Sequence, residues 1–165
     1  MKSIIFLLIV LSTLWSNTLE TVPYVDLERY LGKWYEIARY DHRFERGCSE
    51  VEALYTQRDD GMLGVRNRCF LSDENRTKEA NGRAKIADEK SNSKLKVTFF
   101  WPFYGDYWII ELAEDYRYVV VSEPEKEYFW ILSRTPKLHE TDLIGILERA
   151  SALGFDSTKL IWRKP

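Results

Sequence analysis

The stretch "LGKWYEIARY", residues 31–40, contains the first expected strand of an all-β domain, residues 33–40. Trp34 and Tyr35 follow a glycine, and large aromatic residues among alternating polar ones are typical of a half-buried strand. Glu36 has the same parity as Trp34, so we expect it to point inward. A buried carboxylate must be hydrogen-bonded or neutralised, but the pattern does not identify a partner for Glu36.

Further strands follow this one at a spacing of about ten residues. They are expected at residues 49–57, 62–70, 78–87, 94–101, 106–112, 116–122 and 127–134. Short polar turns such as Asp59-Asp60-Gly61 join them, without a long crossover. Eight strands in consecutive hairpins predict an all-β fold, an up-and-down antiparallel β-barrel, because closure removes the exposed edges. Such a barrel has room for one small ligand.

The C-terminal part has a different period. Apolar residues recur at helical spacing at Leu143, Ile146, Leu147, Ala150 and Leu153, and Gly154 fits as the stop signal. This pattern predicts an α-helix with one apolar stripe, packed against the outside of the barrel. Residues 158–162 are expected to add a short last strand.

The N-terminal residues are interpreted separately from the domain. A short positive start precedes the apolar run "IIFLLIVL", residues 4–11, and small or polar residues follow. This layout predicts a signal peptide at residues 1–16 and one domain at residues 17–165. We therefore expect an exported protein, periplasmic or secreted, with an association to the outer membrane left open. No cysteine lies near the end of the run, so N-terminal lipidation is not expected.

Cys48 and Cys69 are the two cysteines of the chain. Cys48 begins the second expected strand and Cys69 ends the third, so the meander brings both to the same rim. In an oxidising compartment this geometry predicts a disulfide. The alternative is a pair of free buried thiols.

Composition and motifs exclude several function classes. The net charge of -2, without a basic run, excludes an electrostatic grip on nucleic acid. His42 and His139, the only histidines, belong to no set with metal-ligand spacing, and there is no nucleophile elbow or glycine-rich phosphate loop. We therefore expect a binding protein with no metal or cofactor, and not an enzyme.

Two alternatives stay open beside ligand binding. A lipophile-converting barrel enzyme would use an inward polar group such as Glu36, Asn67 or Tyr55 as acid or base. A protein-interaction module would use the loops at the mouth of the barrel and would need no cavity.

Three motifs in order resemble those of the lipocalin family. "GKWYEIARYDHRFERG" resembles the first motif, with Gly32 and Trp34 at its Gly-x-Trp positions, "EDYRY" (114–118) the second, and "WILSRTP" (130–136) the third, with Arg134 as its arginine. The sequences of these motifs are most similar to those of the bacterial lipocalins, which are related to apolipoprotein D and plant temperature-induced lipocalins. The resemblance implies a structural base in which the guanidinium of Arg134 lies over the indole of Trp34.

Parity counted from Arg134 and from the charged strand positions predicts which side chains line the cavity, and Tyr104 and Tyr40 are expected at its rim because of their position near the mouth. The predicted ligand-binding residues are Trp130, Trp108, Phe99, Trp101, Val97, Tyr128, Tyr118, Asn67, Tyr55, Tyr104 and Tyr40. An apolar interior with a cationic and phenolic rim suits an acyl chain with an anionic head, so the expected partner is a fatty acid or lysophospholipid. The alternative is that Trp108 and Trp130 fill a closed core. A peripheral membrane contact and the oligomeric state stay open.

Overall fold

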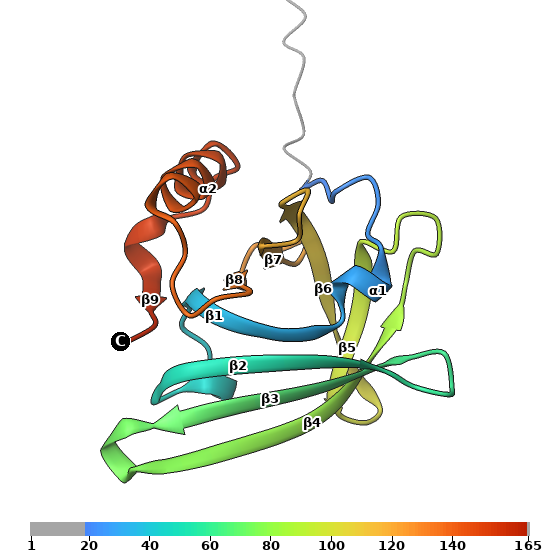
Figure 1. Cartoon of the computed structure of the whole chain (residues 1–165), viewed down its shortest axis with the longest axis horizontal. Coiled ribbons are helices and arrows are strands. Elements are labelled where there is room, and N and C mark those ends of the chain that lie inside the picture. Colours follow the sequence, from blue (N-terminus) through green and yellow to red (C-terminus); the bar gives the residue numbers. More distant parts are fainter. Residues whose placement is uncertain (1–18, 165) are drawn as a thin grey trace, which may run out of the picture.

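The computed structural model describes residues 19–164, so the predicted signal peptide lies outside the described residues. The strands form one antiparallel sheet in the order β2-β3-β4-β5-β6-β7-β8-β1-β9, and β1 also pairs with β2 (Figure 1). This additional pairing closes β1 to β8 into a barrel. The predicted eight-stranded up-and-down barrel with a C-terminal helix outside it is confirmed.

The elements have the following bounds. They are α1 (Leu27–Tyr30), β1 (Gly32–Tyr40), β2 (Cys48–Gln57), β3 (Leu63–Leu71), β4 (Arg76–Ile86), β5 (Lys94–Phe100), β6 (Phe103–Leu112), β7 (Tyr118–Ser122), β8 (Phe129–Ser133), α2 (Glu140–Ala152) and β9 (Leu160–Trp162). Short 3-10 turns cover Arg43–Glu45, Ser72–Glu74 and Ser157–Lys159. Within residues 19–164, no helix is both long and apolar enough to cross a membrane.

The alternation of strand direction gives the barrel two different ends. We call the end at which β1 begins the base, and the end at which β1 finishes the mouth. The loops at the mouth are those that join β1 to β2, β3 to β4, β5 to β6 and β7 to β8. Figure 1 shows β2, β3 and β4 extending together beyond the rest of the barrel toward the β3–β4 hairpin.

Helix α1 was not predicted, and it closes the base. The side chain of Asp26 caps it, because its Oδ1 accepts hydrogen bonds from the backbone N–H groups of Glu28 (3.0 Å) and Arg29 (3.3 Å). The last residue of this single turn, Tyr30, is fully buried. The helix therefore places an aromatic ring under the barrel, against Trp34.

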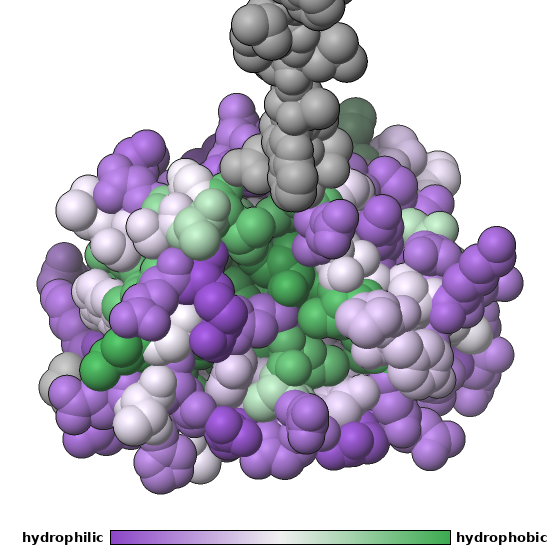
Figure 2. Space-filling view, turned by 90° about the horizontal axis from the view of Figure 1, so that it is seen from above, coloured by the Kyte–Doolittle hydropathy of each residue, from purple (hydrophilic) through white to green (hydrophobic). Residues whose placement is uncertain are grey.

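Helix α2 covers one outer face of the barrel. Its residues Ile146 and Ala150 are buried in an apolar cluster with Val120 and Ile131 from the neighbouring strands β7 and β8. Every residue of β7 is buried, because its inner face belongs to the interior core and its outer face lies under the helix. Viewed from above Figure 1, apolar side chains gather in the middle of the described surface and polar ones surround them (Figure 2).

The strand pairings shift register at four places, and two of these irregularities, in β1 and β6, interrupt the alternation of inward and outward side chains most clearly. In β1 the pairing with β8 shifts between Glu36 and Ala38, and in β6 the pairing with β7 shifts between Ile109 and Glu111. A bulge inserts one extra residue, so every side chain beyond it changes face relative to a strict count of two. The bulge in β1 turns Arg39 inward, and the two bulges together decide which aromatic residues reach the interior.

Candidate functional site

The base of the barrel is closed by the predicted pair Trp34 and Arg134. The guanidinium carbon of Arg134 lies 3.7 Å from the centre of the fully buried Trp34 ring, a cation–π contact. The guanidinium also donates to the carbonyl oxygens of Lys33 (2.8 Å), Arg29 (2.6 Å) and Tyr30 (3.2 Å). The contacts of the Arg134 guanidinium are therefore made with uncharged groups, the indole ring and three backbone carbonyls.

Gly32 is required at this base by its backbone. Its φ of +95° lies in the region that residues with a Cβ rarely adopt, and a Cβ there would lie 3.4 Å from Nη1 of Arg134. The glycine of the first motif therefore permits the turn that brings α1, β1 and Arg134 together.

The floor of the interior is formed by three tyrosines. The hydroxyl of Tyr55 donates to that of Tyr107 over 2.9 Å, and the hydroxyls of Tyr30 and Tyr107 lie 2.7 Å apart. Burial is the main cause that raises the pKa of Tyr55 to about 12, and it raises the pKa of Tyr30 and of Tyr107 well above the ordinary value. All three phenols are therefore neutral hydrogen-bonding groups at physiological pH.

Above the floor, the interior changes from packed to partly open. Near the base, Leu95, Ile109 and Val119 have no exposed surface. Toward the mouth, Phe99 and Trp130 pack against the same core but keep part of their surface exposed. The inward side chains are therefore less completely covered toward the mouth than near the base.

Two predicted residues near the mouth add polar character to this apolar wall. The ring of Tyr128 stacks on Trp130, with centroids 5.6 Å apart and planes 5° from parallel. On the opposite strand β3, the Oδ1 of Asn67 is buried and has no hydrogen-bond partner among the described residues. Val97 also packs against the interior core, as the sequence predicted.

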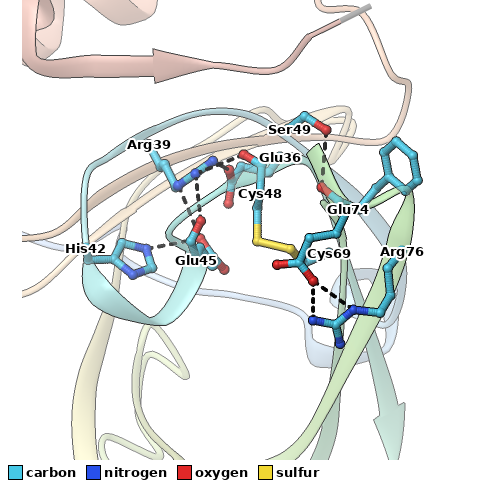
Figure 3. Close-up of a disulfide and its surroundings, with 10 residues drawn as sticks. Glu36, Arg39, His42, Glu45, Cys48, Ser49, Cys69, Glu74 and Arg76 are labelled. Carbon is cyan, nitrogen blue, oxygen red and sulfur yellow. Dashed lines mark hydrogen bonds and ion pairs between the residues drawn. A yellow bond between two sulfur atoms is a disulfide. The ribbon is translucent and has the colours of Figure 1, made fainter. Parts of the chain in front are cut away.

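A buried charged cluster, which we call the mouth cluster, consists of Glu36, Arg39, His42 and Glu45 (Figure 3). Nη1 of Arg39 donates to Oε1 of Glu36 at 2.6 Å, and Nη2 donates to the carbonyls of Glu45 (3.0 Å) and Cys48 (3.1 Å). Nε of Arg39 lies 3.6 Å and Nε2 of His42 3.0 Å from Oε2 of Glu45. The partner of Glu36 that the sequence left unidentified is therefore Arg39.

The pKa values of the two carboxyl groups in the mouth cluster are shifted in opposite directions. Burial and the neighbouring charge of Glu45 raise the pKa of Glu36 well above its ordinary value. Burial also acts to raise the pKa of Glu45, but the contacts with His42 and Arg39 outweigh it and lower that pKa. Because two like charges share one arginine, we infer that Glu36 is the carboxyl that holds a proton first as the pH falls.

The predicted disulfide between Cys48 and Cys69 is confirmed, with a Cα–Cα distance of 5.5 Å. It joins the start of β2 to the end of β3 at the mouth, as the meander topology implied. The carbonyl of Cys48 also accepts from Arg39, so the covalent link and the mouth cluster hold the same loop (Figure 3).

The predicted ligand-facing positions of Trp108 and Tyr118 in the wall, and of Tyr40 at the rim, are wrong. All three belong to the apolar layer under α2, outside the barrel. The hydroxyl of Tyr118 donates to Glu111, and that of Tyr40 accepts from the backbone N–H of Asp156. The bulges in β1 and β6 reverse the parity for Tyr40 and Trp108. Tyr118 was misassigned because β7 is apolar on both faces.

Two further predicted residues lie away from the interior wall. Trp101 belongs to the turn between β5 and β6 and is 72% exposed, together with its neighbours Phe100 and Phe103. Tyr104 lies on the face of β6 opposite to that of the inward Tyr107. Its ring contacts Lys85, whose Nζ lies 4.5 Å from the ring centre. Trp101 was placed by counting parity along β5, whose pairing with β6 shifts register between Val97 and Phe100. Tyr104 was placed by its position near the mouth, which does not determine which way a side chain points.

The structure adds interior residues that the sequence did not indicate. Arg39 and Glu45 of the mouth cluster, and Tyr30 and Tyr107 of the floor, were assigned to no site. Strict alternation placed Tyr107 outside and gave no reason to turn Arg39 inward, since neither bulge has a sequence signal. Among the described residues, no group of three or more His, Cys, Asp or Glu side chains is arranged to hold a metal ion.

Comparison with known proteins agrees with this geometry. The model of the lipocalin-like domain family matches residues 25–165. The outer membrane lipoprotein Blc of Escherichia coli (strain K12) is 46% identical over 137 residues, which cover 83% of this chain and 77% of that protein. Temperature-induced lipocalin-1 of Arabidopsis thaliana is 36% identical over 151 residues, covering 86% and 80% of the two chains. Mouse apolipoprotein D is 31% identical over 145 residues, covering 82% and 74%.

Among solved structures, insecticyanin of the tobacco hornworm Manduca sexta superposes with a TM-score of 0.73 at 21% identity, covering 89% of this chain and 84% of that one. At this identity the likeness concerns the fold alone. The family model spans nearly the whole described chain, and the Gly32–Trp34–Arg134 base and the closed eight-stranded barrel agree with it. The chain is therefore a member of the lipocalin family.

Proposed function

We propose that the protein binds a small lipophilic ligand inside the barrel, through its mouth, for storage or transport. The proposed ligand class is the acyl-chain lipids, fatty acids or lysophospholipids. The observation that carries this proposal is the gradient along the interior, from a sealed base to inward aromatic side chains, Phe99 and Trp130, that keep exposed surface. A hydrocarbon chain that covers such surfaces gains roughly 0.8 kcal/mol for each buried CH₂ group.

The proposed cellular role is lipid handling in the cell envelope. Two observations support it: the signal-like residues 1–16, and the relatives whose names describe them as outer membrane lipoproteins. Under this proposal the chain is exported, and it meets its ligand in or near the outer membrane. A binding role without catalysis agrees with the family, and the polar interior groups serve to fix the loops and the ligand.

The test compares two tryptophans that lie on opposite sides of the barrel wall. Trp130 packs against the interior core, whereas Trp108 lies in the layer outside it. Titration of the protein with fatty acids and lysophospholipids is expected to quench tryptophan fluorescence saturably. In calorimetric titrations, Trp130→Ala is expected to weaken the Kd about tenfold through lost apolar contact, and Trp108→Ala is expected to leave it unchanged.

Two outcomes would overturn the proposal. One is the absence of saturable binding by any acyl ligand. The other is an equal loss of affinity in Trp130→Ala and Trp108→Ala, which would assign the effect to the general stability of the barrel. Native mass spectrometry of the protein purified from its source then identifies the lipid that it retains.

A further inference from the structure

The tyrosine floor contains one hydrogen-bond donor more than it uses. Tyr30, Tyr55 and Tyr107 carry three O–H groups, and only two hydroxyl–hydroxyl contacts join them. Each contact uses one proton, and none of the three hydroxyls has another hydrogen-bond partner within residues 19–164. One O–H group is therefore left over, and a buried donor without a partner is costly.

The hydrogen-bond pattern shows which hydroxyl can carry this proton. Tyr55 donates to Tyr107, so the hydroxyl of Tyr107 already accepts one bond. Either hydroxyl can be the donor in the contact between Tyr30 and Tyr107. When Tyr30 donates, Tyr107 accepts from both neighbours and its own proton is left free. An oxygen atom that reaches the floor would accept that proton from Tyr107, the hydroxyl that both contacts share.

The surroundings favour an uncharged partner for this donor. Tyr107 packs in the interior core with Val97, Phe99 and Leu95, which supply no cation. At the base, Arg134 directs its Nη groups to backbone carbonyls and its guanidinium lies over Trp34. A carboxylate at the floor would lose its hydration without gaining an ion pair. A hydroxyl or carbonyl oxygen can accept the O–H bond at a much smaller desolvation cost.

A second unpartnered polar atom lies higher in the same interior. Asn67 follows Val65 by two residues on β3, and Val65 pairs with Tyr55. The backbone of Asn67 is therefore about 7 Å nearer the mouth than that of Tyr55, and the buried Oδ1 of Asn67 has no hydrogen-bond partner among the described residues. Besides the charged mouth cluster, the interior thus offers unsatisfied polar groups at two depths.

We infer that the barrel selects an oxygenated lipophile, whose hydroxyl or carbonyl group at the buried end of the chain accepts a hydrogen bond from Tyr107. This inference rests on the proposed lipid-binding function and names the ligand class within it. The floor then acts as a polar end stop. The affinity should be highest for a chain whose length brings the oxygen atom to the tyrosines while its other end lies at the mouth.

The experiment uses pairs of ω-hydroxy fatty acids and unsubstituted fatty acids of equal chain length, over a series of lengths. At the length that reaches the floor, the wild-type protein is expected to bind the ω-hydroxy acid at least as tightly as the unsubstituted one. Tyr107→Phe is expected to weaken binding of the ω-hydroxy acid about threefold to tenfold and to leave the unsubstituted acid unaffected.

Tyr30→Phe is the matched control, because it also removes one buried hydroxyl. Tyr107 still accepts from Tyr55 in that variant and keeps its own proton, so the preference for the ω-hydroxy acid is expected to remain. Thermal unfolding and near-UV circular dichroism verify that both variants are folded. Because each variant is compared with itself on two ligands, a general loss of stability cancels.

The outcomes separate the inference from the proposed function. If neither acid of any pair and no lysophospholipid binds to the wild type, the proposed function fails. If the unsubstituted acid binds but the ω-hydroxy acid is weaker at every length, the floor donates only to water and the inference is overturned. The same conclusion follows if Tyr107→Phe and Tyr30→Phe change the ratio of the two affinities equally.

Discussion

Each end of the barrel holds an arginine, half-buried at the base and buried at the mouth, and the two arginines are satisfied in different ways. At the base, Arg134 lies on the ring of Trp34 and donates to three backbone carbonyls. At the mouth, Arg39 is paired with Glu36 and lies within 3.6 Å of Glu45. The neutral partners of Arg134 do not titrate, whereas those of Arg39 do. The base is therefore a permanent closure, and the mouth is held by charges that depend on pH.

Among the variants that test this comparison, removal of Arg39 is expected to lower the free energy of unfolding most. Arg39→Met leaves two buried carboxyl groups without their cation, so we expect the free energy of unfolding to fall by about 3–5 kcal/mol at neutral pH. Chemical denaturation monitored by tryptophan fluorescence measures the loss. The double variant Arg39→Met/Glu36→Gln is expected to recover part of it. A single variant as stable as the wild type would mean that the mouth cluster contributes no net electrostatic restraint.

Arg134→Lys tests the base with a smaller change. Lysine keeps the charge and can lie over the indole, but it lacks the planar fork that reaches three carbonyls. We expect a loss of about 1–2 kcal/mol in denaturation. The loss should be the same at mildly acidic and at neutral pH, because no partner at the base titrates in that range. A strong pH dependence would contradict the view that the base is held by neutral groups.

Glu36→Gln tests the pH dependence of the mouth. The pKa of Glu36 is raised in the folded protein above its ordinary 4.5, so its contribution to stability is present in mild acid and is lost as the pH rises through the folded pKa. Glu45, with a lowered pKa, loses its contribution only as the pH falls below that range. The unfolding free energy of the wild type minus that of Glu36→Gln should therefore decrease from about pH 4.5 to neutral pH. Thermal unfolding at several pH values gives this difference, and an increase would refute the assignment.

The exposed turn at the mouth should give the smallest effect. Trp101 is 72% exposed, so Trp101→Ser is expected to change the free energy of unfolding by less than about 0.5 kcal/mol. Denaturation curves of the two proteins measure it. A loss above 1.5 kcal/mol, roughly the cost of removing a buried apolar side chain, would place the indole against the barrel after all.

The sequence predicted the base and the disulfide region more accurately than the ligand wall. Gly32, Trp34 and Arg134 each carry a distinctive residue type, and the meander fixes the meeting of Cys48 and Cys69 whatever the detailed register. The wall depended on counting parity along each strand. That count holds on β2, β3 and β8, where Tyr55, Val65 and Leu132 reach the interior core.

The count failed where a single residue was inserted or where both faces were apolar. Bulges in β1 and β6 reversed the faces of Tyr40 and Trp108, and the alternation in β7 was hidden because α2 buries its outer face. Because a bulge shifts one residue without changing composition, it leaves no pattern that a periodicity argument can detect.

By itself the sequence determined the barrel, the outer helix, the disulfide and the closure of the base, because periodicity, chain topology and rare residue types are local or nearly local properties. Only the tertiary structure decided that Arg39 turns inward to meet Glu36 and that three tyrosines from α1, β2 and β6 meet at the floor. These contacts join residues up to 77 positions apart and depend on register and bulges to within one residue. Such precision comes from the packing of all strands together, and no single strand encodes it.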